Sequence, residues 1–270
     1  MTESETGNSL NYSLEVSYDG GCFAGWQSQP DGAGVQDALE RALRELGERG
    51  APGMPRGLCR VNGAGRTDAG VHARAQVASV SLRHAWVPRR LVLALNAHLP
   101  GALSVTRAAL VPAGFHARRS ALSREYRYFI WNASTCYPHI RRCVLWRPGT
   151  RYDWVRASRA AEAFIGRHDF RAFCRACDVP ESTEREVIRS SLHIRGNLIV
   201  FRVEANAFLT NMVRIMAGSL MEIARGRFDE ARLAHLLQGG ASRSENAPTP
   251  SPSGLFLWKV NYPEAIAWEP

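Results

Sequence analysis

Hydrophobic and polar residues recur with two periods along the first 110 residues, and these periods predict strands and helices. Alternation over residues 13–18 predicts a half-buried strand, whereas apolar residues at every third or fourth position over 35–46 predict an amphipathic helix ending near Gly47 and Gly50. The same criteria predict a second helix at 88–98 and further strands at 58–61, 76–82 and 103–110. This order is that of the split βαβ, or ferredoxin-like, arrangement, in which both helices cover one face of an antiparallel sheet.

The second half of the chain shows the same two periods. Residues 123–131 alternate as a strand does, with Arg124 and Tyr126 on one face and Glu125 and Arg127 on the other. The other predicted elements are helices at 154–165 (capped by Asp153), 211–225 and 229–237, a strand pair at 186–194 and 198–204, a last strand at 255–260, and loops at 174–184 and 239–253. Because the order of elements is similar in both halves, we predict two α/β subdomains that share one sheet, although we find no residue-level repeat.

The composition divides the chain into three predicted segments. The polar residues 1–10 are expected to form a disordered tail. Residues 11–110 are predicted to form an N-terminal α/β subdomain and residues 111–270 a C-terminal one. The start of the chain lacks the basic and apolar regions of a signal peptide, and no apolar run is long enough to span a bilayer. We therefore expect a cytoplasmic protein without a membrane segment.

A glycine-rich loop is predicted between the second and third strands, and it carries Arg66 and Asp68. Glycine lets the backbone approach a ligand closely, so such a loop can present a reactive side chain between two rigid strands. A glycine-rich turn is also common in proteins without any role in a site. Gly65 and Gly70 have the spacing of a phosphate-binding P-loop, but Val71 stands where that motif requires lysine. The sequence thus argues against a nucleoside triphosphate site.

The formal net charge is +9, and most of the excess lies in one stretch of the chain. Residues 118–159 contain ten arginines against Glu125 and Asp153, a net of +8. The aromatic residues in this stretch are Tyr126, Tyr128, Phe129, Trp131, Tyr137, Trp146, Tyr152 and Trp154. Clustered cations repel one another unless an anion neutralises them, and aromatic and guanidinium planes recognise unstacked RNA bases. The stretch is predicted either to bind RNA or to be a solvated basic face over an ordinary core strand.

The six cysteines and eight histidines show no complete metal-binding pattern. Only Cys174 and Cys177 have the spacing of a metal or redox pair, and no second pair completes a zinc site. We therefore predict no metal and expect the cysteines to be reduced core residues. His72 is predicted to be a packed loop residue rather than a base.

The residues from Gly65 to Ala73 resemble the signature of the tRNA pseudouridine synthase A family, in which the aspartate is the catalytic nucleophile. The resemblance continues in the family's order from about Tyr12 to Tyr262, nearly the whole chain. Its further motifs are Tyr18-Asp19-Gly20, Gly25-Trp26-Gln27, Asn96-Ala97-His98-Leu99-Pro100, Phe115-His116-Ala117-Arg118, Arg124-Glu125-Tyr126-Arg127-Tyr128, Ala205-Asn206-Ala207-Phe208, Met212-Val213-Arg214 and Gly254-Leu255. A nine-residue match, together with further motifs that occur in the family's order, is specific evidence for the resemblance.

The resemblance implies the α+β pseudouridine synthase fold, in which two ferredoxin-like subdomains share a mainly antiparallel central sheet, with helices packed on it and a basic cleft. It implies that uridines 38, 39 and 40 of the tRNA anticodon arm are isomerised to pseudouridine. It also implies a homodimer, with each tRNA lying across both subunits. No cofactor is expected, because the reaction neither gains nor loses electrons.

The resemblance also assigns roles to individual residues. Asp68 is implied to be the nucleophile, and Arg66 to assist base flipping and contact the RNA backbone. Tyr126 is implied to stack on the target base and Leu255 to pack against it, while Arg214 pairs with Asp68 and keeps it ionised. The other expected RNA-binding residues are Arg118, Arg141 and Arg142.

Several alternatives stay open at this level. The carboxylate could attack C1′ or C6 of the uridine, or act as the base of a glycal route. Glu125 and residues 239–253 follow the family only loosely, so the resemblance does not fix substrate contacts there. The chain could be a related synthase that acts on another RNA, or an RNA-binding module without catalysis. Asp68 beside Arg66 argues against the last alternative.

Overall fold

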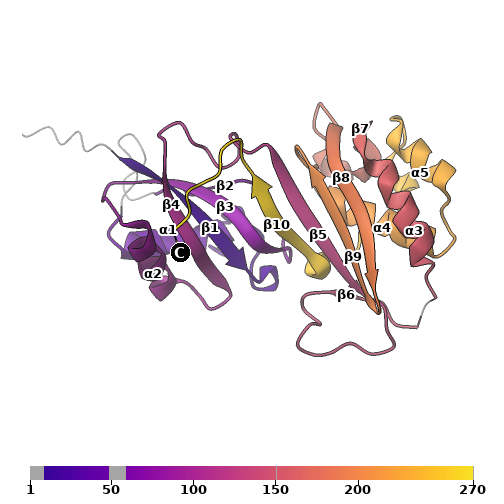
Figure 1. The fold of residues 1–270 in the computed structure, drawn as a ribbon, viewed down its shortest axis with the longest axis horizontal. Helices are drawn as coiled ribbons and strands as arrows, with labels where there is room; N and C mark the ends of the chain where they lie inside the picture. Colours follow the sequence, from indigo (N-terminus) through magenta and orange to yellow (C-terminus); the bar gives the residue numbers. More distant parts are fainter. Residues whose placement is uncertain (1–8, 49–58, 150, 270) are drawn as a thin grey trace, which may run out of the picture. The chain divides into compact units, whose positions relative to one another are not determined.

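The structure is a computed structural model that describes residues 9–48, 59–149 and 151–269, and the chain divides into two compact units (Figure 1). Unit 1 comprises the described residues up to Leu122 together with residues 260–269, and unit 2 comprises Ser123–Lys259. The boundary therefore lies after Leu122 rather than near residue 110. The reason is that residues 112–122 bond within unit 1, where the Ala117 amide donates to Ser79 Oγ at 3.1 Å.

Four strands of unit 1 form an antiparallel sheet. They are β1 (Leu10–Tyr18), β2 (Asn62–Gly63), β3 (His72–Leu82) and β4 (Leu103–Val111). The central strand β1 pairs with both β3 and β4, and β2 pairs with β3, so the strand order is β4-β1-β3-β2. Tyr12, Leu14 and Val16 of β1 are completely buried, as expected for a central strand. This is the ferredoxin-like order that the pattern of the first half predicts.

The two helices of unit 1 are α1 (Val35–Glu45) and α2 (Pro88–His98). The apolar stripe of α1, formed by Val35, Leu39 and Leu43, is fully buried, and α1 ends before Gly47, whose φ of 78° suits a residue that follows a helix. α2 packs against α1 and β4, and Figure 1 shows the two helices side by side. Both helices lie where the sequence predicts them.

Unit 2 repeats the strand order of unit 1 with unrelated residues. Its main strands are β5 (Ser123–Trp131), β8 (Glu184–Arg195), β9 (Leu198–Ala205) and β10 (Leu255–Asn261), of which the last two residues belong to unit 1. β9 pairs antiparallel with both β5 and β8, and β10 is the other neighbour of β5, giving the order β10-β5-β9-β8. β8 and β9 form the predicted hairpin, in which Gly196 has a φ of 58°. The two halves, whose similarity is predicted from the order of their elements, therefore share the same strand topology.

The helices of unit 2 are α3 (Trp154–Ala160), α4 (Met212–Ala224) and α5 (Glu230–Leu237). Asp153 caps α3 by accepting from the Arg156 amide at 2.9 Å, as predicted. α4 is apolar on almost every side and is buried against α3 and β5. The predicted helix at 154–165 is α-helical only to Ala160 and continues as the 3₁₀ turn Ala161–Phe164.

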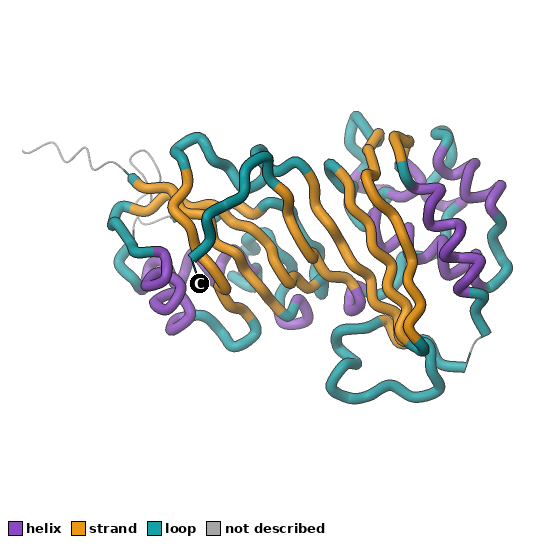
Figure 2. The backbone as a smooth tube through the Cα atoms, viewed as in Figure 1, coloured by secondary structure: helices purple, strands orange, loops and turns teal. Residues whose placement is uncertain are grey.

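Several short elements complete the fold. β6 (Leu145–Trp146) runs parallel to β5, and β7 (Gly166–Asp169) pairs antiparallel with β8. The remaining 3₁₀ turns are Gly20–Cys22, Arg171–Phe173, Ala176–Asp178, Arg243–Glu245 and Pro252–Gly254. In Figure 2 the connection from β5 to β6, residues 132–144, is the long loop below the strands of unit 2. The sequence pattern predicts neither β6 nor β7, because each is too short to show a period.

Some predicted boundaries are wrong or fall outside the described residues. The strand predicted at 58–61 is wrong over its described part, because the Val61 amide donates to Glu40 Oε1 at 3.0 Å instead of to a neighbouring strand. Leu10, predicted to belong to the tail, is the first residue of β1. Residues 1–8 of that tail, and also Gly50 and Leu58, lie outside the described residues.

Candidate active site

The loop of residues 64–71, between β2 and β3, carries Arg66 and Asp68. Its second half is a tight turn in which the Val71 amide donates to the Asp68 carbonyl oxygen at 3.1 Å. Gly70 is the third residue of this turn and has a φ of 79°, a conformation that glycine adopts without steric cost. Asp68 therefore stands at the start of a turn that leads directly into β3.

The first half of the loop is fixed to β3 by the amide of Gln76, which is completely buried. Gln76 Nε2 donates to the Gly65 carbonyl oxygen at 2.7 Å, and Gln76 Oε1 accepts from the Gly65 amide at 3.3 Å. The Ala64 amide adds a bond to the Val77 carbonyl oxygen at 2.8 Å. A buried amide that satisfies both backbone groups of one residue holds that residue in one place. The backbone that leads to Arg66 is consequently rigid.

Thr67, between the two charged residues, attaches the loop to the rest of unit 1 through hydrogen bonds. Its hydroxyl shares a 2.8 Å hydrogen bond with the Tyr18 hydroxyl, and both side chains are buried. Its carbonyl oxygen accepts from the Trp26 amide at 3.0 Å. Burial raises the pKa of Tyr18 to about 12, so the Tyr18 hydroxyl stays protonated at neutral pH. With Thr67 turned inward, Arg66 is exposed and Asp68 is partly exposed.

Gly25 lies so close to this loop that a side chain would collide with it. A Cβ atom on Gly25 would be 2.7 Å from the Thr67 carbonyl oxygen, and Gly25 also has a φ of 99°. Gly32 shares the positive φ, at 72°, but its Cβ would meet only the end of the Arg41 side chain, at 3.5 Å. A substitution at Gly32 therefore tests backbone strain alone, whereas a substitution at Gly25 tests strain together with collision against the loop.

We expect Gly32→Ala to lower the free energy of unfolding by about 1–2 kcal/mol, the cost of a left-handed conformation for a residue with Cβ. Gly25→Ala should lower it further, because its Cβ must also displace the Thr67 backbone. Urea denaturation of the two variants and the unsubstituted protein measures the difference. Equal losses would mean that the loop moves freely away from residue 25.

His72 is packed, as predicted, but it is the first residue of β3 rather than a loop residue. Its Nδ1 accepts a hydrogen bond from the Gly20 amide at 3.2 Å and lies 3.3 Å from Asp19 Oδ1. β3 starts earlier than its apolar pattern indicates because Ala73 pairs with Tyr18 of β1. The strand thus begins directly after the loop 64–71.

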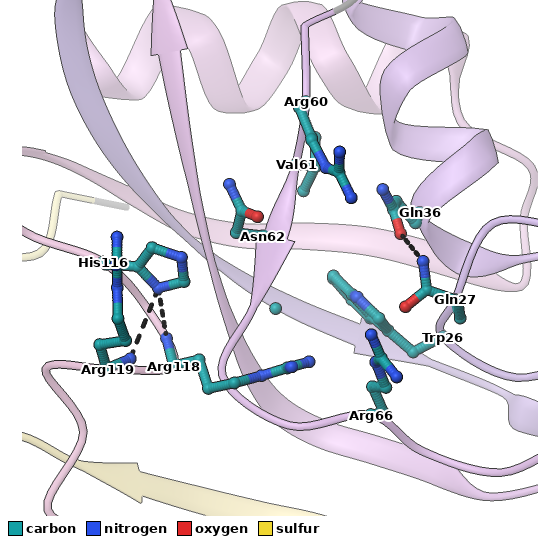
Figure 3. Close-up of a pocket in the computed structure, with 11 residues that line it drawn as sticks. Trp26, Gln27, Gln36, Arg60, Val61, Asn62, Arg66, His116, Arg118 and Arg119 are labelled. Carbon is teal, nitrogen blue, oxygen red and sulfur yellow. Dashed lines mark hydrogen bonds between the residues drawn. The ribbon is translucent and has the colours of Figure 1, made fainter.

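A cleft of about 380 Å³ opens in unit 1 beside the loop. Figure 3 shows Arg60, Arg66 and Arg118 reaching into it, and the Arg119 side chain beside the His116 ring. Burial lowers the pKa of His116, and the positive charges of Arg119 and Arg118 lower it further. Two predicted residues, Arg66 and Arg118, are therefore brought into one basic cleft.

In unit 2 the guanidinium of Arg214 is fixed in the first turn of α4. Its Nε and Nη2 donate to the Pro250 carbonyl oxygen at 2.9 and 2.8 Å, and its Nη1 donates to Asn211 Oδ1 at 2.7 Å. Asn211 has a φ of 64°, an uncommon conformation for a residue other than glycine. A residue with an uncommon backbone conformation, Asn211, is therefore hydrogen-bonded directly to Arg214, which is one of the predicted site residues.

The other two predicted residues of unit 2 lie on strands. Tyr126, on β5, is 7% exposed and packs edge-to-face against Phe208, with ring centres 5.0 Å apart. Leu255 is the first residue of β10 and is 5% exposed. The preceding residue, Gly254, lies so close to β5 that a Cβ atom on it would be 2.4 Å from the Phe129 carbonyl oxygen, so only glycine fits there. Both side chains are buried within unit 2.

The arginines of residues 118–159 divide between structural and exposed positions. Arg124 donates to the Asn206 carbonyl oxygen at 2.9 Å, Arg127 pairs with Glu125 at 2.8 Å, and Arg156 pairs with Glu230 at 3.1 Å. Arg141 and Arg142 are exposed on the loop 132–144, and the Arg141 guanidinium lies 4.8 Å from the centre of the Trp146 ring. The stretch thus includes both arginines that bond within the protein and arginines that are exposed.

Two residues that shape the candidate site are missing from the sequence-based set. Gln76 could have been suspected, because an amide between the apolar residues Ala75 and Val77 of a buried strand needs partners. Arg60 carries no comparable signal, since a single arginine before a short strand is unremarkable. Its place in the cleft is a consequence of tertiary structure.

Among the residues described, no group of three or more His, Cys, Asp or Glu side chains could hold a metal ion, and no helix is long and apolar enough to cross a membrane. All six cysteines are described and unbonded to one another. Cys59 and Cys174 are buried, but Cys22 and Cys177 are exposed, so the expectation that all cysteines are core residues is wrong.

Comparison with known proteins gives a consistent result. A family model described as tRNA pseudouridine synthase matches residues 15–118 and 160–263. The tRNA pseudouridine synthase A of Citrifermentans bemidjiense is 39% identical over 94% of this chain and 98% of its own length, and that of Bordetella avium is 40% identical over 93% and 91%. Among solved structures, a Cbf5-Nop10-Gar1 complex aligns at 12% identity over 78% of this chain and 44% of that chain, with a TM-score of 0.36. The matches in sequence extend through both units, and the chain belongs to the tRNA pseudouridine synthase family.

Proposed function

We propose that this protein isomerises uridine to pseudouridine at positions 38, 39 and 40 of the tRNA anticodon arm, with Asp68 as the nucleophile. Membership of the family supports the reaction and the substrate class. The observation that carries the role of Asp68 is the braced loop 64–71, which holds Asp68 between Thr67 and a tight turn while leaving it partly exposed. A reactive group on a rigid loop is pre-organised for attack.

The reaction exchanges one bond of the base for another. The C1′–N1 glycosidic bond breaks, the base rotates, C5 bonds to C1′, and the C5 proton is lost while N1 gains a proton. The Asp68 carboxylate supplies the first step by adding to C1′ or C6, or by removing a sugar proton in a glycal route, and is regenerated at the end. Product and substrate have the same composition, so neither oxidant nor cofactor takes part.

The target uridine must leave its stack to reach a loop side chain, which costs a few kcal/mol. We assign Arg66 to this step, because it is exposed on the same loop as Asp68 and lines the basic cleft. Tyr126 is proposed to stack on the flipped base and Leu255 to pack against it. The proposed role of Arg214 is to keep Asp68 ionised, and its three hydrogen bonds to Pro250 and Asn211 hold its guanidinium in place for that role.

We further propose that the enzyme acts in the cytoplasm as a homodimer, with each tRNA lying across both subunits, as the resemblance implies. Arg118, Arg141 and Arg142 are proposed to contact the tRNA backbone. The exposure of the last two on the loop 132–144 supports this assignment. Phosphate contacts of this kind provide most of the affinity of a protein for nucleic acid.

The function is tested with the purified full-length protein and tRNA carrying tritium at C5 of uridine. We expect tritium release, and site mapping should place pseudouridine at positions 38 to 40. Pseudouridine in total RNA but at sites outside the anticodon arm would identify a synthase for another RNA. Tight RNA binding without tritium release would identify an RNA-binding module that lacks catalysis.

Replacing Arg141 and Arg142 with glutamine should weaken binding to all tRNAs similarly. It should also flatten the dependence of log affinity on log salt by about 0.7 to 0.9 for each phosphate that is no longer neutralised. A salt titration of affinity measures this slope. The charge-matched control is Arg89→Gln with Arg90→Gln, which removes two exposed arginines of α2. A slope equal to that of the unsubstituted protein would show that Arg141 and Arg142 do not bind RNA.

A further inference from the structure

Two adjoining clefts of unit 1 have basic walls. The first, of about 380 Å³, lies beside the loop 64–71, and the second, of about 300 Å³, continues from it toward Ser79 and Ser81 of β3. They share the side chains of Arg60, Asn62, His116 and Arg119, and the first adds Arg66 and Arg118. All lining residues of both clefts are described, and none is an aspartate or glutamate. The two clefts therefore form one uninterrupted basic surface.

Three of the four arginines that line this surface differ from the paired arginines elsewhere in the described residues. Arg60, Arg66 and Arg119 form no ion pair with any carboxylate in the described part of the chain, although Arg127, Arg156 and several other arginines do. Like charges that converge on one cleft repel one another, and an anion in the cleft removes that repulsion. Burial is the main cause of the lowered pKa of His116, and the nearby positive charges of Arg119 and Arg118 lower that pKa further.

We propose that these two clefts bind the phosphodiester backbone of the RNA strand that carries the target uridine, with Arg60 and Arg119 as the main phosphate-binding residues. The identity of the RNA rests on the proposed function. Arg66 connects the two sites, since it lines the first cleft and is two residues from Asp68. A nucleotide held at Asp68 would thus have its neighbouring phosphates within reach of the basic surface.

The shape and chemistry of the surface favour a polyanionic chain over a single ion or a stacked base. A guanidinium presents a planar fork of donors that matches phosphate oxygens. Two adjoining clefts provide more room than one phosphate group needs. In the first cleft Trp26 is 2% exposed, so a base cannot stack on it, and in the second cleft the Phe115 ring already packs against Tyr262, with ring centres 5.1 Å apart. Recognition here should therefore depend on charge and not on base sequence.

The proposal is tested first by the salt dependence of RNA binding. Full-length protein with Arg60→Gln and Arg119→Gln is titrated with an anticodon-arm RNA at several salt concentrations. We expect weaker binding at low salt and a log–log slope reduced by about 0.7 to 0.9 for each phosphate that the variant no longer neutralises. Arg89→Gln with Arg90→Gln is the control for the same change in net charge.

A second experiment locates the phosphate. Single methylphosphonate groups, which are uncharged, replace the phosphates that flank the target uridine one at a time. We expect one or two positions where this replacement weakens binding to the unsubstituted protein several-fold but has no further effect on the double variant. Inorganic phosphate is tested as a competitor in parallel, because a site for a free anion would bind it without any such position-specific coupling.

Each outcome decides the proposal. Equal slopes for the double variant and the α2 control, or the absence of any coupled phosphate position, would overturn it. Saturable binding of inorganic phosphate that is abolished in the double variant, without a coupled position in RNA, would reassign the clefts to a free anion. Because binding and coupling are measured without turnover, an absence of pseudouridine formation would reject the proposed function separately from this inference.

Discussion

Asp68→Asn is expected to abolish pseudouridine formation while the affinity for an anticodon-arm RNA stays within a few-fold. The carboxylate supplies the chemistry, whereas phosphate contacts by arginines supply most of the affinity. Removing a nucleophile that acts as part of a unit costs about 10⁴-fold or more in rate. Single-turnover assays and equilibrium binding on the same RNA measure the two effects independently.

Asparagine at position 68 keeps the backbone bonds that shape the loop. The turn at residues 68–71 depends on the backbone carbonyl of Asp68, and the loop is held by Thr67 and Gly65, so asparagine leaves those bonds in place. Asp31→Asn is the matched control, because Asp31 is exposed in the same unit and bonds only to the Ala33 amide among its described partners. Turnover by Asp68→Asn near that of the control would refute the nucleophile assignment.

The second large effect is expected at Tyr126, whose ring and hydroxyl are proposed to serve different steps. Stacking on a base needs the ring and is worth about 1–3 kcal/mol, whereas removing the C5 proton needs the phenolic oxygen. Tyr126→Phe should therefore permit glycosidic cleavage but stall at the last step, with an adduct or unreleased product accumulating. Tyr126→Leu should damage the earlier steps as well, because the ring is absent.

Packing must be separated from chemistry in this experiment. Tyr126 is nearly buried and meets Phe208 edge-to-face, an arrangement that phenylalanine preserves and leucine does not. Phe208→Leu is the control, since it removes the same ring pair but leaves Tyr126 intact. Single-turnover rates with C5-deuterated uridine report the late step. A Tyr126→Phe variant with the unsubstituted rate and no isotope effect would rule out a role for the hydroxyl.

The sequence predicts most of the secondary structure because local patterns dominate it. The apolar stripe of α1 and the proline at the start of α2 define those helices without any tertiary information. The predicted bounds of an element are wrong where its residues have hydrogen-bond partners elsewhere in the fold. The stretch before Asn62 is not a strand because Val61 bonds to Glu40 of α1, and β3 starts at His72 because its first residues pair with the end of β1.

The sequence by itself also determined the family and the residue proposed to react, since the motif around Asp68 is contiguous and its order with the other motifs is specific. Only the tertiary structure decided how that residue is presented. Tyr18 is distant from the loop in sequence and Gln76 lies on the strand that follows it, and both hold the loop through side-chain hydrogen bonds. The basic clefts likewise combine Arg60, Arg66 and Arg119 from three segments. A linear pattern records the period of one element, whereas a site depends on which elements the folded chain brings together.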